Sequence, residues 1–91
     1  MPDFLVELYL SRTDLAAVER RAERARLAAE ALSREGTPVR YVGSIFMPED
    51  ETCFLLYEAG RAQDVEEAAR RAAVPVERLA EVLTEGRGPG G

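Results

Sequence analysis

The segment YVGSIFMPEDETCFLLYEA, from Tyr41 to Ala59, constrains the fold more than any other part of the chain. Two apolar runs of strand length, Val39–Met47 and Thr52–Ala59, flank the short acidic sequence Pro48-Glu-Asp-Glu51. Such a connection is typical of a turn between two antiparallel strands. Its consecutive carboxylates lack the spaced ligand pattern of a calcium loop. The chain is therefore predicted to contain a β-hairpin whose acidic turn lies in solvent.

A further strand is predicted near the N-terminus, where apolar residues of strand type follow one another from Phe4 to Leu10. Successive side chains of a strand point to opposite faces, and one face here is uniformly apolar: Phe4, Val6, Leu8 and Leu10. That face is expected to lie under helices. The other face carries Leu5, Glu7 and Tyr9, a mixture expected of a surface that lines a cavity or meets a partner.

Two helices are predicted from apolar residues at helical spacing. The stripe of the first helix consists of Leu15, Val18, Ala22, Ala25, Ala29 and Leu32. Ser11 or Thr13 is expected to cap this helix, and Gly36 and Pro38 to end it. The second helix is predicted from about residue 61 to 73, and Pro75 stops it.

The segment 76–85 has an imperfect alternation, which favours an edge strand around Leu79–Thr84 but leaves a third helix open. With that strand, the order β-α-β-β-α-β predicts an α+β, ferredoxin-like fold: a four-stranded antiparallel sheet with both helices on one face. The other face would be open and partly apolar, so two copies are expected to close face to face as a dimeric α/β barrel. We predict a single domain over residues 1–85 and a flexible glycine- and proline-rich tail over 86–91.

The composition restricts the partners of the chain. Its 91 residues carry a net charge of −5, and all twelve basic residues are arginines, most of them interleaved with glutamates, which argues against nucleic acid. No apolar run approaches the roughly 18 residues that a membrane-spanning helix needs. The N-terminus has no secretory signal pattern, and a single cysteine suits a reducing compartment. We therefore predict a cytoplasmic protein with no nucleic-acid or membrane partner.

Few residues can carry chemistry. The chain has no histidine, which excludes Ser–His–Asp and Cys–His arrangements, and one cysteine excludes a standard zinc site. Cys53 is either a small core residue or a thiolate ligand or nucleophile. Glu7 and Glu58 each lie in an apolar strand. They are either solvated or, on neighbouring strands, a pair that binds a cation or shares a proton.

Three aromatic residues complete the candidate site. Tyr9, Tyr41 and Tyr57 occur in predicted strands and are candidates to line the same cleft as the two glutamates. Packing in the core is the alternative for each of them, since aromatic residues are common in strands for that reason.

Several stretches in a consistent order carry a resemblance: "FLVE", "GSI", "CFLLYEA" and "ARRAAVPVERLAEV". Together they resemble a small bacterial family of unknown function that includes a nickel-binding protein. The resemblance implies a ferredoxin-like fold, a homodimer, and binding of nickel or a related divalent ion. The positions that match the family pattern are Glu7, Ser44, Cys53, Tyr57, Glu58 and Pro75. The two family histidines are replaced here by Gly43 and Ala68, so nickel loses its preferred nitrogen ligands.

Three hypotheses for function follow. The first is a non-catalytic homodimeric binding module, with a small ligand in the cleft between the two sheets. The second is a protein that binds a divalent metal, nickel or zinc, through Cys53 with Glu7 or Glu58. The third is a cofactor-independent oxygenase or isomerase of the dimeric α/β-barrel type, with Glu7 and Glu58 as an acid–base pair. A binding module is favoured over an enzyme, and we assign no catalytic residue.

Overall fold

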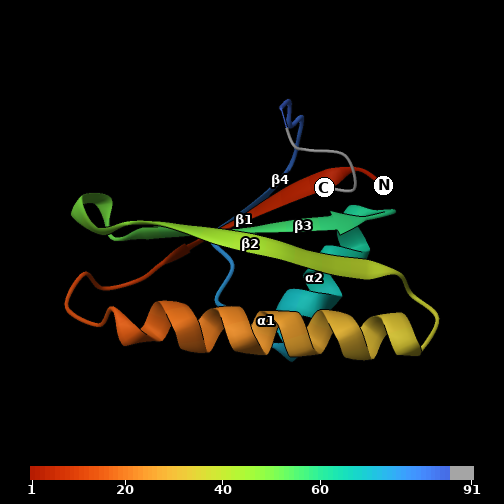
Figure 1. The fold of residues 1–91 in the computed structure, drawn as a ribbon, viewed down its shortest axis with the longest axis horizontal. Coiled ribbons are helices and arrows are strands. Elements are labelled where there is room, and N and C mark those ends of the chain that lie inside the picture. The colour runs from red at the N-terminus through yellow and green to blue at the C-terminus, as the bar shows by residue number, and fades with distance from the viewer. Residues whose placement is uncertain (87–91) are drawn as a thin grey trace.

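The computed structural model describes residues 1–86, and it has the predicted order of elements (Figure 1). These elements are β1 (Asp3–Tyr9), α1 (Ala16–Arg34), β2 (Val39–Met47), the 3₁₀ turn η1 (Pro48–Asp50), β3 (Thr52–Ala59), α2 (Ala62–Arg71) and β4 (Arg78–Val82). The strands form one antiparallel sheet in the order β2-β3-β1-β4. Both helices lie on the same side of this sheet, which confirms the ferredoxin-like fold (Figure 1).

The sheet resolves the ambiguous segment 76–85. The segment after α2 forms an edge strand, as favoured, because β4 pairs with β1 along its whole length. Residues 87–91, most of the tail predicted to be flexible, lie outside the described residues. No helix within residues 1–86 is long and apolar enough to cross a membrane.

The start of α1 differs from the prediction. Its N-cap is Leu15, which makes no capping bond with its side chain and is exposed instead of belonging to the buried stripe. Ser11 and Thr13 serve the preceding turn: the Ser11 Oγ accepts a hydrogen bond from the Thr13 N–H at 3.2 Å. The Asp14 N–H donates to the Ser11 carbonyl at 3.1 Å. Both predicted caps are therefore wrong, because this turn forms before the helix begins.

The ends of both helices follow one motif, in which two N–H groups beyond the helix reach back to its last carbonyls. After α1, Gly36 has a φ of 105° and Thr37 donates to the Leu32 carbonyl at 3.1 Å. After α2, Ala73 takes the equivalent left-handed position with a φ of 56°, and Val74 donates to the Ala69 carbonyl at 2.9 Å. The second helix therefore ends with an alanine at a position that favours glycine.

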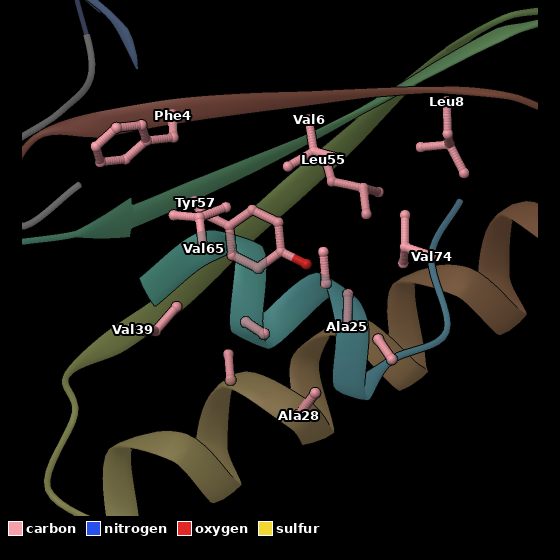
Figure 2. Close-up of a cluster of buried hydrophobic side chains, with 14 of the residues drawn as sticks. Phe4, Val6, Leu8, Ala25, Ala28, Val39, Leu55, Tyr57, Val65 and Val74 are labelled. Atoms are coloured by element: carbon pink, nitrogen blue, oxygen red, sulfur yellow. The ribbon is translucent and has the colours of Figure 1, made fainter. Parts of the chain in front are cut away.

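The core lies between the sheet and the helices (Figure 2). The sheet contributes large side chains that are fully buried, among them Val6, Leu8, Leu55 and Tyr57. The helices contribute mainly alanines, which let their backbones lie close to the sheet. Figure 2 shows the Tyr57 ring between the two layers, and its hydroxyl has no hydrogen-bond partner within the described part of the chain.

Candidate functional site

The open face of the sheet, meaning the side chains that point away from α1 and α2, carries most of the candidate residues. The strand register arranges these side chains in rows across β2, β3, β1 and β4. The rows are Ile45–Phe54–Glu7–Arg78, Gly43–Leu56–Leu5–Ala80 and Arg40–Glu58–Asp3–Val82, with Met47, Thr52 and Tyr9 in a shorter fourth row. The middle row is entirely apolar, and the rows on either side of it contain charges of both signs.

A hollow of about 120 Å³ lies in this face, over β1, β4 and the neighbouring part of β3. Its lining consists of Leu5, Glu7, Phe54, Arg78, Ala80 and Val82. The small side chain of Ala80 helps to leave this space open. The hollow therefore combines apolar walls with one carboxylate and one guanidinium group.

Glu7 and Glu58 share the open face, as predicted, but they are not neighbours. Glu7 is opposite Phe54, whereas Glu58 is opposite Asp3, four residues away along β1. At about 3.4 Å per residue this separates the two positions by roughly 13 Å. One reacting group cannot contact both carboxylates of a single copy, so the arrangement does not support the acid–base pair of an oxygenase or isomerase.

The carboxylate of Glu58 is instead neutralised by Arg40 on the neighbouring strand β2. The Arg40 Nη1 lies 2.9 Å from the Glu58 Oε1, and the Glu58 side chain is only 15% exposed. Arg40 and Glu58 are direct partners in the register of β2 and β3. This cross-strand ion pair is a second charged feature of the open face, distinct from the hollow.

The three candidate tyrosines divide between the two faces. Tyr9 lies on the open face, and its hydroxyl donates to the Glu51 Oε2 at 3.3 Å. Tyr41 and Tyr57 lie on the helix-covered face, where their rings meet edge to face with centroids 5.8 Å apart. Burial raises the pKa of both hydroxyls. The prediction that Tyr41 and Tyr57 line the same cleft as Tyr9 is therefore wrong.

Cys53 also lies on the helix-covered face. It is 0% exposed, between its strand partners Leu8 and Phe46. Burial raises the pKa of its thiol, and the guanidinium group of Arg21 opposes this effect more weakly. The sheet itself separates this thiol from Glu7 and Glu58, so the structure does not bring the predicted metal ligands together.

Metal-ligating side chains are not grouped elsewhere in the described part of the chain either. Within residues 1–86, no three or more histidine, cysteine, aspartate or glutamate side chains are grouped so that they could hold a metal ion. The two positions at which the resembling family has histidine lie in different layers. Gly43 is on the open face with free space beside it, whereas Ala68 is buried in the core.

Two charged residues of the open face, Arg78 and Arg40, were not predicted from the sequence. Arg78 belongs to a segment whose alternation is imperfect, and only its pairing with Glu7 reveals its position beside that carboxylate. Arg40 is likewise recognised only through its pairing with Glu58. No local sequence signal singles out either arginine from the other ten.

A larger groove of about 660 Å³ runs beside the first half of α1, but its charges are matched. Arg20 pairs with Asp14 at 2.9 Å, and Arg21 donates to the Ala73 carbonyl at 3.0 Å. Glu19 and Glu23 also line the groove, and Glu23 pairs with Arg26 beside it, so this surface presents no excess of positive charge. We therefore take the open face, and not this groove, as the candidate functional site.

Comparisons with known proteins agree with the fold. The model of a family described as "Nickel responsive protein SCO4226-like" matches residues 4–82. The crystal structure of SCO4226 from Streptomyces coelicolor A3(2) is similar, with a TM-score of 0.68 and 18% sequence identity. The similarity covers 92% of this chain and 99% of that one. Among curated proteins, none matches the chain significantly.

Proposed function

This chain belongs to the SCO4226-like family of nickel-responsive proteins, and from this premise we propose that it is a homodimeric binding module. Its small ligand lies between the open faces of two copies. The observation that carries this proposal is the apolar content of the open face, which no described element covers (Figure 1). The side chain of Ile45, for example, is 60% exposed, and it lies beside Phe54 and Leu56 of the adjacent strand.

Pairing of two open faces has a clear physical basis. Burial of apolar surface stabilises association by about 25 cal/mol per Å², and a domain of this size has little core of its own. The apolar middle row, with Leu56 and Leu5, supplies such surface. The row that contains Arg40 and Glu58 carries an ion pair that is already closed within each copy, so these two charges neutralise each other where the faces meet.

The oligomeric state tests this proposal. Sedimentation velocity at micromolar concentration should show a dimer for the natural protein. Ile45→Glu should shift it to a monomer, because the new carboxylate would be buried against an apolar partner surface. The matched control is Leu27→Glu, which changes a leucine that is 50% exposed on α1 and should leave the dimer intact. A monomeric natural protein, or equal behaviour of both variants, would contradict the proposal.

Nickel is the ligand to which the family name points, and the residues present do not fit it. Late divalent metals prefer imidazole and thiolate, but this chain has no histidine, and its one thiol is buried beneath the sheet. Native mass spectrometry with added nickel should therefore show no stoichiometric retention. Retention that Cys53→Ala abolishes would restore the metal-binding alternative.

A further inference from the structure

The two charged groups in the hollow differ from the other charged pair on the same face. Glu7 and Arg78 are direct partners across β1 and β4, just as Arg40 and Glu58 are across β2 and β3. The Arg40–Glu58 pair closes to 2.9 Å. The side chains of Glu7 and Arg78 make no ion pair or hydrogen bond within residues 1–86, although both line the hollow. Two opposite charges therefore stand apart at one small apolar cavity.

Enclosure would make this arrangement costly without a ligand. If a second copy covers the open face, Glu7 and Arg78 leave water, and buried charges without partners are strongly unfavourable. A molecule that carries both an ammonium and a carboxylate group would satisfy both at once. The ammonium group would donate to Glu7, and the carboxylate would accept a forked pair of hydrogen bonds from Arg78.

The walls and the size of the hollow restrict the rest of such a molecule. Leu5, Phe54 and Val82 present apolar surface, which suits an aliphatic group. A volume of about 120 Å³ in one copy restricts the ligand to a small molecule. We propose that the hollow binds a small zwitterion, an α-amino acid with a short apolar side chain. This inference rests on the proposed dimer for its enclosure.

Binding of L-valine tests the inference directly. Isothermal titration with L-valine should give saturable binding, whereas N-acetyl-L-valine, which lacks the ammonium group, and L-valinamide, which lacks the carboxylate, should bind much more weakly. A hydrogen bond to a charged group is worth about 1.5–3 kcal/mol, so each analogue should lose on the order of tenfold to a hundredfold in affinity.

Variants of the two charged residues test which group of the ligand each residue binds. Glu7→Gln should weaken L-valine by a similar factor and remove the preference for L-valine over its N-acetyl form. Arg78→Gln should do the same for the preference over L-valinamide. The matched controls are Glu81→Gln, on the other face of β4, and Arg34→Gln, at the end of α1, and both should bind like the natural protein.

Sedimentation of the same samples separates this inference from the proposed function. A dimer that does not bind L-valine at millimolar concentration overturns the amino-acid site and leaves the dimeric module standing. A monomer that binds L-valine with the expected dependence on Glu7 and Arg78 supports the site and overturns the dimer. Equal binding of L-valine and both analogues would overturn the inference, because the two charges would then take no part.

Discussion

Replacing Tyr57 with phenylalanine should raise the stability of this protein. The Tyr57 side chain is fully buried between the sheet and the helices, and its hydroxyl has no hydrogen-bond partner among residues 1–86 (Figure 2). The substitution keeps the ring, and with it the edge-to-face contact with Tyr41. It removes only the hydroxyl, which loses its hydration on folding and gains no hydrogen bond within residues 1–86 in exchange.

The size of the effect follows from that atom. A buried hydroxyl without a partner costs about 1–3 kcal/mol on scales derived from protein variants. We therefore expect Tyr57→Phe to raise the free energy of unfolding by about 1–2 kcal/mol. In a domain of this size, each kcal/mol corresponds to roughly 4–8 °C in Tm.

Urea denaturation followed by circular dichroism measures this change, and the midpoint should rise at an unchanged slope. The control is Tyr9→Phe, which removes a hydroxyl from an exposed ring on the open face and should change stability by about 0.5 kcal/mol or less. A loss of stability in Tyr57→Phe would refute the reasoning. It would mean that the hydroxyl has a partner, such as a buried water molecule, that satisfies it.

Three further predictions concern the helices and the thiol. Ala73→Gly should raise the free energy of unfolding by up to about 1 kcal/mol in urea denaturation, because the φ of 56° at Ala73 favours glycine. The control is Ala69→Gly, in the helix interior, which should lower the free energy of unfolding by about 1 kcal/mol or more. Hydrogen bonds, mainly from Arg70 and then from Arg71, lower the pKa of Glu67 from its ordinary 4.5 to about 2. The stabilisation from this lower pKa is complete above pH 4.5 and is lost as the pH falls towards 2, so the natural protein should lose stability more steeply over that window than Glu67→Gln; parallel slopes would contradict this. Cys53 should react with a thiol reagent only after unfolding, because burial hides the thiol and raises its pKa, and rapid modification of the native protein would show that the thiol is accessible.

The sequence predicted the order of the elements well, because that order depends on local patterns. The alternation in β1 and β3 and the helical stripe of alanines are each set by neighbouring residues. The same alternation also held information that the interpretation of the site did not use. Tyr57 and Glu58 are adjacent in one strand and so must point to opposite faces, and Cys53 and Glu58 are separated by an odd number of positions.

Tyr41 was misplaced for a different reason. A β-bulge between Tyr41 and Gly43 shifts the alternation within β2, so that Tyr41 points to the helices while Gly43 and Ile45 point to the open face. An uninterrupted strand would have put all three on one side. Such a bulge depends on the pairing of β2 with β3, and a glycine in the strand was its only local sign.

The sequence by itself determined which residues of β1 and of β3 share a face, and it predicted the two helices and the first three strands. Those properties arise from the periodicity of the backbone over a few residues. Only the tertiary structure decided that Arg78 comes to lie beside Glu7, and that both side chains line one hollow of the open face. These relations depend on the register between β1 and β4, which are separated by most of the chain, and that register is set by packing of the whole core.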